Sequence, residues 1–375
     1  MAKKAQEEKP SSSNESKKVQ AIIDAISKSR KTNHLLCSLD VPDWELVPLN
    51  DPELDSLLGG GFAMGRMYSI ESLFSGGKST LILETIAQVL KKYPTKYAYL
   101  ADVEGTLDRE YAAFLIGEAW YEGRVIIDPS INGQEIVNTA MDLMESGAVA
   151  VIAIDSWAAI ETPTEQKADE IGNQSVGALA RFGTDVLKFL KNSAAQNSVL
   201  FLMANQLRVN ITPMGARGNN ASGGRAAVFY PDVRIELTKP NSKDDTRIAT
   251  IIKSKTAAQV HATCTFSVVH NYGIDRIQSL INYFIRCKSP WFLMGGNKWY
   301  TVIDPETGEV LLKGQGDKFY DLLRNNSQLL ERLSTAHSLP AIESRDFLQR
   351  KQQVAQIPAT EIDTLISLEP VFDNH

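Results

Sequence analysis

The chain has 375 residues, of which 43% are hydrophobic and 22% are charged. This composition is typical of a soluble globular protein of about two domains, and it excludes wholly disordered and collagen-like chains. The formal net charge of −6 excludes a uniformly basic nucleic-acid coat but leaves room for a local DNA site, because binding depends on where the charges lie.

Membrane-spanning and secretory segments are not expected. No apolar run approaches the ~18 residues that a membrane helix needs, and the polar, charged start of the sequence is unlike a secretory signal. The three cysteines Cys37, Cys264 and Cys287 are far apart, so neither a disulfide framework nor a zinc site is predicted. They fit a reducing compartment such as the cytoplasm.

Residues 1–44 are expected to be a polar tail followed by a short oligomerisation helix. Residues 1–33 carry eight Lys or Arg against four Asp or Glu. Apolar residues recur there at helical spacing, namely Val19, Ile22, Ile23 and Ile26. An isolated helix cannot bury such a stripe, so we expect it to dock on the body of the protein or on a neighbouring subunit.

Residues 45–275 are expected to form the core, an α/β fold around a mostly parallel central sheet. The β-rich runs are Met67–Ile70, Tyr97–Ala101, Ala148–Ile154, Val199–Ala204, Val233–Leu237, Ile248–Ile252 and Thr265–Val269. Helical patterns separate the earlier runs, at Thr80–Lys92, Gln134–Met144 and Val176–Ala194. Strands that alternate with helices predict βαβ units, and near-continuous apolar strands predict a sheet buried on both faces. The later runs lack intervening helices, which predicts an antiparallel extension of this sheet.

Residues 276–338 are expected to form a small α+β domain. Helical patterns are mixed there with a hairpin signal, in which Trp299–Val302 and Val310–Lys313 flank a turn at Pro305–Gly308. Residues 339–375 are expected to be a flexible, mildly acidic tail, because Asp and Glu exceed Lys and Arg by 6 to 3 from residue 341 onwards.

A phosphate-binding loop is predicted where a strand, a glycine-containing loop and a helix follow one another. Such a P-loop needs small residues whose N–H groups surround the phosphates, a lysine for the β- and γ-phosphates and a hydroxyl for Mg²⁺. Gly77, Lys78 and Ser79 fill these roles, although Ser72 stands where the usual pattern has its first glycine. The predicted nucleotide-binding residues of the loop are Ser75, Gly76, Gly77, Lys78, Ser79 and Thr80.

Carboxylates follow two of the other predicted strands. Asp155 ends the run Ala148–Ile154, where a Walker B aspartate would hold Mg²⁺ together with Ser79; a helix cap is the alternative. Glu104 is a candidate for polarising the water that attacks the γ-phosphate, with Asp102 in support. Surface loop charges are the alternative for both. The sequence therefore predicts ATP with Mg²⁺ as the cofactors.

Residues 207–225 are expected to be a DNA-binding loop between two strands, with three arginines, four glycines and no acid. Arginines suit phosphate contacts, and apolar side chains can enter between bases. Both kinds of contact predict DNA binding that does not depend on sequence. An exposed loop with incidental arginines is the alternative. The predicted DNA-binding residues are Arg208, Ile211, Met214, Arg217, Gly223, Gly224 and Arg225.

Five ordered segments beyond the P-loop resemble those of bacterial RecA and the related phage recombinases: ADVEGTLDREYA, SGAVAVIAIDSWAAIETPTE, MANQLRVNI, SGGRAAVFYPDVRIEL and IIKSKTAA. The resemblance runs from about residue 45 to Gly316, where KGQG looks like part of the small RecA C-terminal domain. It implies a RecA-type ATPase core and an ATP-dependent recombinase that forms helical filaments on single-stranded DNA. Exchange with homologous double-stranded DNA in the cytoplasm of a bacterial or phage-infected cell is implied too. Accessory mediator and single-strand-binding proteins are conceivable further partners.

The resemblance also implies roles for single residues. Glu104 looks like the catalytic glutamate, and Gln206 matches the glutamine that senses the γ-phosphate and orders the DNA loop. Lys253 and Lys255 match the pair that reaches across the filament interface to the neighbour's ATP. The other matches are nucleotide-site residues: Lys78, Ser79, Asp108, Tyr111 and Asp155. Of these, Asp108 and Tyr111 correspond to positions beside the adenine, although a half-buried tyrosine is the alternative for Tyr111.

Two other functions remain open. A ring-forming motor such as a replicative helicase shares the core fold, but a DNA loop followed by a KGQG-bearing C-terminal domain favours the filament. A DNA-binding paralogue that does not hydrolyse ATP is the second alternative. The presence of Lys78, Glu104 and Asp155 weighs against it, whereas Ser72 in the P-loop keeps it open.

Overall fold

The computed structural model describes residues 43–73, 75–166, 177–211, 217–241 and 244–339, with a helical stretch at residues 21, 22, 24–26 and 28. The chain divides into two compact units, residues 1–45 and 46–375. Ile22 and Ile26 of the predicted N-terminal helix lie in the helical stretch. Val19, Ile23 and the predicted acidic tail from residue 340 onwards lie outside the described residues.

A central sheet organises the second unit, and ten of its strands lie in the described residues. They are β3 (Met67–Ser72), β4 (Tyr97–Asp102), β5 (Val125–Asp128), β6 (Val149–Asp155), β7 (Leu200–Ile211), β8 (Arg217–Ala221), β9 (Val233–Thr238), β10 (Thr246–Lys253), β11 (Thr263–Val269) and β12 (Gly273–Ile274). The order is β12-β11-β10-β9-β3-β7-β6-β4-β5, with β8 paired to β7. The pairs from β9 to β5 are parallel, and β10, β11 and β12 continue the sheet antiparallel. The predicted mostly parallel sheet with an antiparallel extension is confirmed.

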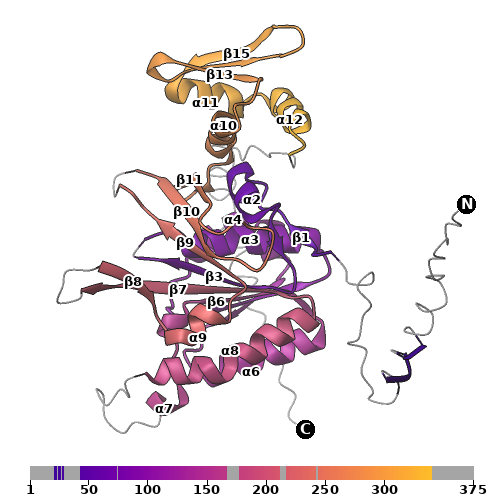
Figure 1. The fold of residues 1–375 in the computed structure, drawn as a ribbon, viewed down its shortest axis with the longest axis vertical. Coiled ribbons are helices and arrows are strands. Elements are labelled where there is room, and N and C mark those ends of the chain that lie inside the picture. Colours follow the sequence, from indigo (N-terminus) through magenta and orange to yellow (C-terminus); the bar gives the residue numbers. More distant parts are fainter. Residues whose placement is uncertain are drawn as a thin grey trace, which may run out of the picture. The chain divides into compact units, whose positions relative to one another are not determined.

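Helices cover both faces of this sheet (Figure 1). One face packs against α2 (Pro52–Leu58), α3 (Lys78–Lys92) and α4 (Arg109–Ile116), and the other against α6 (Gly133–Ser146), α8 (Ala178–Gln196) and α9 (Gly224–Phe229). Side chains of β6 alternate between the two hydrophobic clusters, since Val151 and Ala153 face one and Ile152 and Ile154 the other. The sheet is therefore buried on both faces, as its apolar strands require.

Several short elements connect these parts. They are β1 (Leu46–Val47), β2 (Phe62–Ala63), α5 (Glu118–Tyr121), α7 (Pro163–Gln166) and a 3-10 turn at Trp157–Ala159. Among the described helices, none is long and apolar enough to cross a membrane.

Side-chain caps set the start of α2, α4 and α6, whereas α3, α8 and α9 each begin after a glycine without such a cap. Asp108 and Asn132 accept hydrogen bonds from first-turn N–H groups of α4 and α6. Gly77 precedes α3 with a φ of 92° and offers no side chain to cap it. The first N–H groups of α3 are thus left for another partner, and the N-terminus of a helix attracts anions.

A separate hydrophobic cluster holds the C-terminal part of the described chain together. It is built from α10 (Arg276–Arg286), β13 (Phe292–Gly295), a 3-10 turn (Gly296–Lys298), β14 (Trp299–Ile303), β15 (Val310–Gln315), α11 (Gly316–Arg324) and α12 (Ser327–Ala336). The three strands form an antiparallel sheet. The predicted hairpin is present as β14 and β15.

Buried charges join α10 to α2 and α3, a contact region called the α2–α10 joint below. The guanidinium of Arg276 lies 2.8 Å from the Glu84 carboxylate of α3 and donates to the carbonyl of Leu49 at 3.1 Å. Arg286 pairs with Glu53 of α2 at 3.0 Å. Glu84, Glu53 and Arg276 are all buried, so these pairs tie the start of the C-terminal module to the core.

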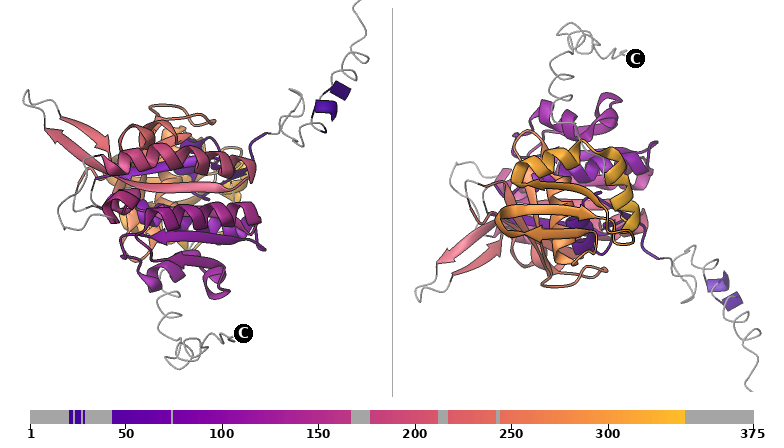
Figure 2. Two further views of the ribbon diagram at one scale, coloured as in Figure 1. Left: turned by 90° about the horizontal axis from the view of Figure 1, so that it is seen from below. Right: turned by 90° about the horizontal axis from the view of Figure 1, so that it is seen from above.

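The predicted DNA loop is largely a β-hairpin. Strand β7 continues through Ile211 and pairs antiparallel with β8, from Leu207 opposite Ala221 to Ile211 opposite Arg217. Both views of Figure 2 show this ribbon projecting away from the rest of the sheet. The expectation of a loop is wrong for residues 207–211 and 217–221. Residues 217–221 have low β-propensity, but they form a strand because the extended part of β7 has an edge with which they can pair. Residues 212–216, with Met214, lie outside the described residues, as do the side chains of residues 208–221.

Candidate functional site

The carboxyl ends of four parallel strands bring distant residues to one edge of the sheet. The register places Ser72 of β3 opposite Gln206 of β7, and Asp102 of β4 opposite Asp155 of β6. Ligands of open α/β sheets bind at this edge. Sheet pairing alone therefore gathers most of the predicted nucleotide site.

The predicted phosphate loop is the turn between β3 and α3. Ser75 lies in this turn with a φ of 53°, Gly76 is buried, and Gly77 directly precedes the helix. Lys78 is the first residue of α3, and its Nζ lies 3.0 Å from the hydroxyl of Ser72. The loop thus presents a lysine and uncapped helical N–H groups together, which suits the β- and γ-phosphates.

Burial lowers the pKa of Lys78, and the nearby carboxylates of Asp155 and Glu104 oppose this shift. Burial also raises the pKa of Asp155; Glu104 and Asp102 add to the rise, whereas the hydroxyl of Ser79 and the charge of Lys78 oppose it. Two carboxylates therefore act on Lys78, and a third, Asp102, acts on Asp155. The site would be stabilised by a further cation.

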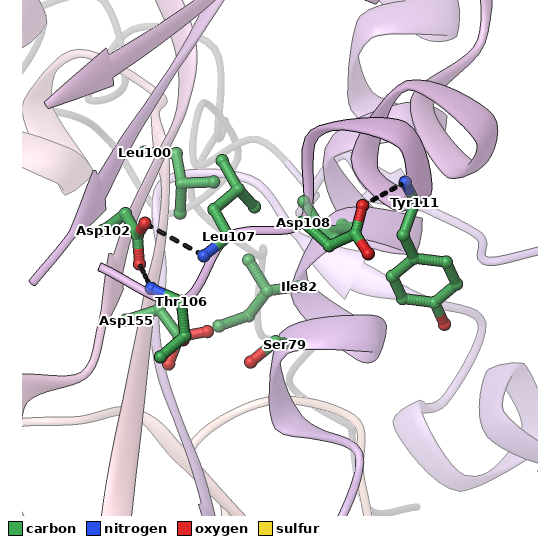
Figure 3. Close-up of a pocket in the computed structure, with 10 residues that line it drawn as sticks. Ser79, Ile82, Leu100, Asp102, Thr106, Leu107, Asp108, Tyr111 and Asp155 are labelled. Carbon is green, nitrogen blue, oxygen red and sulfur yellow. Dashed lines mark hydrogen bonds between the residues drawn. The ribbon is translucent and has the colours of Figure 1, made fainter. Parts of the chain in front are cut away.

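Mg²⁺ fits the residues at this place. The hydroxyl of Ser79 and the carboxylate of Asp155 lie side by side at the pocket drawn in Figure 3. Mg²⁺ takes oxygen ligands and usually keeps water and substrate phosphates in its shell, so a few protein oxygens suffice. In the described part of the chain, no group of three or more His, Cys, Asp or Glu forms an all-protein metal site.

The pocket beside these residues is lined by both apolar and polar side chains. Its lining residues are Ser79, Ile82, Leu83, Leu100, Asp102, Thr106, Leu107, Asp108, Tyr111 and Asp155. Asp108 accepts a hydrogen bond from the Tyr111 N–H at 3.0 Å, and the Tyr111 hydroxyl lies 3.1 Å from that of Thr80. The structure thus brings both residues matched to the adenine side to the same pocket as Ser79 and Asp155 (Figure 3).

Glu104 is held by Gln206 of β7 and by Ser156, which directly follows β6. Its carboxylate accepts hydrogen bonds from the Ser156 hydroxyl at 2.5 Å and from the Gln206 amide at 2.8 Å. Asp102 accepts from the N–H groups of Thr106 and Leu107 at 3.2 and 3.1 Å, and so closes the turn that carries Glu104. The contact of Ser156 with Glu104 was not predicted, although its place directly after Asp155 at the end of β6 marks its position.

Hydrogen bonds continue from Gln206 to the base of the hairpin. The Gln206 carbonyl accepts from the N–H of Ser222 at 3.1 Å, and the Asn205 amide donates to the Ser222 carbonyl at 2.9 Å. Gln206 therefore contacts Glu104 through its side chain and Ser222, which directly follows β8, through its backbone. The candidate ATP site and the base of the β7–β8 hairpin are in direct contact.

The predicted DNA-binding glycines have a packing role. Gly223 has a φ of 87°, and a Cβ there would lie 2.7 Å from Nε1 of the buried Trp157. Gly224 has a φ of 68°, and a Cβ there would lie 2.6 Å from the Cβ of Ala180. Both positions require glycine. Arg225, the next residue, is exposed on α9.

Lys253 and Lys255 do not line the pocket of Ser79 and Asp155. The ammonium of Lys253 donates to the backbone carbonyls of Val228, Phe229 and Pro231 at 2.5 to 3.3 Å. Burial, followed by the charge of Lys255, lowers the pKa of Lys253 to about 8. Lys255 lines a basic surface pocket with these residues: Thr184, Lys188, Lys191, Asn192, Arg225, Ala226, Phe229 and Tyr230. The Phe229 ring is 66% exposed there, so the pocket offers cations and an uncovered aromatic side chain together.

Comparison with known proteins identifies the family. The model of the RecA N-terminal domain matches residues 17–275. The chain belongs to the RecA family. It therefore stands among proteins of DNA recombination and repair that bind DNA and ATP, and its P-loop is of the RecA type.

Curated relatives agree with this assignment. Protein RecA of Porphyromonas gingivalis is 29% identical over 350 residues, which are 88% of this chain and 96% of that protein. Protein RecA of Methylococcus capsulatus is 31% identical over 69% of this chain and 76% of that protein. The crystal structure of the RadB recombinase is 21% identical, covers 61% of this chain and 98% of that one, and has a TM-score of 0.47. At this TM-score the RadB likeness adds nothing to the family assignment.

Proposed function

We propose that this protein is an ATP-dependent DNA recombinase that forms helical filaments on single-stranded DNA. In these filaments it pairs that strand with homologous double-stranded DNA and exchanges strands. The observation that carries the proposal is the contact of Gln206 with Glu104 on one side and with Ser222, at the base of the hairpin, on the other. A ligand change at the ATP site would act directly on the DNA-binding segment.

In the ATP step, Lys78 and the N-terminus of α3 bind the β- and γ-phosphates. Mg²⁺, held by Ser79 and Asp155, neutralises phosphate charge when it is bound. Glu104 orients the attacking water and accepts its proton, while the bond between the γ-phosphorus and the bridging oxygen breaks. The products are ADP and inorganic phosphate. Asp108 and Tyr111 form the adenine side of the pocket.

Gln206 is the proposed link between the ATP and the DNA. Its amide donates to Glu104 at 2.8 Å, and a γ-phosphate would compete for the same N–H donors because charged acceptors bind them more strongly. The exchange would release Glu104 for the water and shift the base of the hairpin. DNA binding should therefore depend on the triphosphate.

The β7–β8 hairpin is the proposed interface with single-stranded DNA. Arg208, Arg217 and Arg225 would contact phosphates, and Ile211 and Met214 would enter between bases. Gly223 and Gly224 would keep the base of the hairpin packed on Trp157 and Ala180. These contacts do not depend on base identity, as a recombinase that acts on any sequence requires.

Lys253 and Lys255 are proposed to act on the ATP of an adjacent subunit. Lys255 faces outward in the basic pocket with Arg225 and Phe229, and two cations near a transferred phosphoryl group stabilise its charge. A Lys78→Ala variant and a Lys253→Ala/Lys255→Ala double variant should each be inactive alone. Mixed on single-stranded DNA, they should regain phosphate release. If co-assembly is verified and no mixing ratio restores turnover, the shared site is wrong.

Electron microscopy with ATP and single-stranded DNA tests the assembly. Helical filaments that need both ligands are the expected result. Closed rings would instead support a RecA-fold motor, and DNA binding without ATP hydrolysis would support a non-hydrolysing paralogue. Glu104→Gln in parallel should give filaments that persist, because ATP is bound and not turned over.

A further inference from the structure

Ser72 has an unusual position, at the end of β3 where a P-loop normally has its first glycine. The residue is 1% exposed. Its hydroxyl donates to the carbonyl of Leu73 at 2.6 Å and accepts from the Nζ of Lys78 at 3.0 Å. A hydroxyl has one proton and two lone pairs. Because the proton is directed at Leu73, the lone pairs are fixed towards the lysine.

Lys78 has few other partners. Within the described residues, Ser72 is its one side-chain hydrogen-bond partner, and no carboxylate lies within ion-pair distance of its ammonium. An ammonium group has three N–H donors. One donor on Ser72 leaves two for the phosphate oxygens of a nucleotide, and the hydrogen bond fixes the direction in which those two point.

Gly76 shows that the Ser72 side chain occupies space inside the loop. A Cβ at Gly76 would lie 2.4 Å from both the Cβ and the Oγ of Ser72. The next atom it would meet is the Leu237 carbonyl oxygen, at an acceptable 3.4 Å. No left-handed φ demands glycine at position 76. Ser72 alone therefore excludes any larger residue at position 76.

We propose that Ser72 is a positioning residue that aims Lys78 at the β- and γ-phosphates, and that Gly76 is the glycine its side chain requires. This inference rests on the proposed ATP site. The loop thus has Ser72 at the position of the usual first glycine and a required glycine four positions later, at Gly76. The hydroxyl of Ser72 sets the direction of the Lys78 side chain. The substitution of the first glycine is thus compatible with tight nucleotide binding, provided that Ser72 and Gly76 occur together.

The first test measures ATP, ADP and AMP affinity by calorimetry in EDTA, so that Mg²⁺ ligands do not contribute. Ser72→Ala should weaken ATP and ADP binding by about 10-fold, as expected for loss of a hydrogen bond to a charged group. AMP, which has no β- or γ-phosphate, should bind unchanged. Ser69→Ala is the matched control, because Ser69 lies on the same buried strand but donates to Glu71 at 2.9 Å. Its ADP affinity should equal that of the unchanged protein, and melting temperatures verify that all variants fold.

A double-mutant cycle separates this inference from the proposed function. In a Lys78→Met background, Ser72→Ala should have no further effect on ADP affinity, because Ser72 acts through the lysine. An equal loss in both backgrounds, or a Ser72→Ala variant that binds ADP like Ser69→Ala, would overturn the positioning role. If Lys78→Met itself left ATP and ADP binding intact, the proposed ATP site would fail instead.

The second test uses Gly76. Gly76→Ala should lower ADP affinity by about 10-fold or more, because its methyl group cannot fit beside Ser72 without distorting the loop. In a Ser72→Gly background, which has already lost the hydroxyl, Gly76→Ala should cause no further loss of ADP affinity. If Gly76→Ala weakens ADP binding equally in both backgrounds, glycine is needed at position 76 for a reason other than Ser72, and the pairing is wrong.

Discussion

Lys78 and Arg276 are both cations drawn into the core, but their surroundings differ. Lys78 is half-buried, donates to the hydroxyl of Ser72 and stands beside carboxylates that it does not pair with. Arg276 is 5% exposed, pairs with the fully buried Glu84 and donates to a backbone carbonyl. The comparison teaches that a cation such as Lys78, which has unused donors near a pocket, is available to bind a ligand. A cation such as Arg276, which is paired with a buried carboxylate of another helix, instead holds elements of the fold together. The predictions below test this difference from the largest expected effect to the smallest.

Glu84→Gln should destabilise the α2–α10 joint strongly. The change leaves the Arg276 charge buried without its carboxylate, which typically costs about 3–5 kcal/mol in unfolding free energy. Urea denaturation of the full chain measures the loss. Glu145→Gln, at an exposed position of α6, is the control and should change stability by less than about 0.5 kcal/mol. A loss below about 1 kcal/mol at Glu84 would contradict the structural role of the pair.

Lys78→Ala should have the opposite effect: a large loss of ATP affinity and a small change in stability. ATP affinity should fall by about 10²-fold or more, and ATP-dependent DNA binding should be lost, because the phosphates lose the closest cation of the loop. Unfolding free energy should change by no more than about 1 kcal/mol, since one hydrogen bond to a neutral hydroxyl is lost. Lys91→Ala, at the exposed far end of α3, should bind ATP normally. Normal ATP binding by Lys78→Ala would remove the P-loop assignment.

Glu104→Gln should separate binding from hydrolysis at the same edge of the sheet. The amide keeps an acceptor for Ser156 but cannot take a proton, so turnover should fall by ~10²-fold while ATP binding is retained. Phosphate release on single-stranded DNA measures turnover. Glu110→Gln, an exposed position on the neighbouring helix, should keep its full rate. Unchanged turnover in Glu104→Gln would mean that another residue orients the water.

Asp51→Asn should have the smallest effect, seen as a change in pH dependence. Burial raises the pKa of Asp51 to about 6 and that of Asp55 to about 7. Both carboxyls therefore bind protons more tightly in the folded chain than in the unfolded chain, where their pKa is about 4. Stability should fall as the pH rises from 5 to 8.

The asparagine variant removes one of these titrating groups. It keeps an acceptor for the Leu54 N–H and places an amide beside the hydroxyl of Ser279. Unfolding free energy measured at several pH values should fall less steeply than in the unchanged protein, by about 1 kcal/mol over this range. Identical slopes would show that Asp51 does not titrate in the fold.

The core of the fold could be predicted because its strands are buried on both faces. Such strands are near-continuous apolar runs, as in β6, and the helices between them have an amphipathic period. Three strands of the central sheet were not predicted, namely β5, β8 and the two-residue β12. β5 has four residues, at the edge of the sheet and partly exposed, so its pattern is weak. β8 reads Arg-Gly-Asn-Asn-Ala and is a strand only because β7 extends beyond the sheet to pair with it.

The residues of the candidate site that are close in sequence could be predicted, whereas the contacts between residues far apart in sequence could not. Lys78 and Ser79 are contiguous in a strand–loop–helix pattern, and Asp155 ends a strand, so sequence order alone points to them. The contacts of Glu104 with Ser156 and Gln206 join three strands whose order in the sheet is not written in any local pattern. The hydrogen bonds of Lys253 to three backbone carbonyls likewise depend on the backbone conformation at the end of α9. The contact of Lys78 with Ser72 required the side-chain rotamers.

Strand β3 has a consequence for synthesis of the protein. It carries the start of the phosphate loop and lies between β7 and β9, which are made much later. At 5–20 residues per second, translation from Ser72 to Thr238 takes roughly 10 to 30 s. Until β7 has been made, a strand that is fully buried in the finished sheet has neither of its final neighbours, and it lacks β9 to the end of the interval. The contact of Gln206 with Glu104 can therefore form only after β7 has been made, well after the residues that line the pocket.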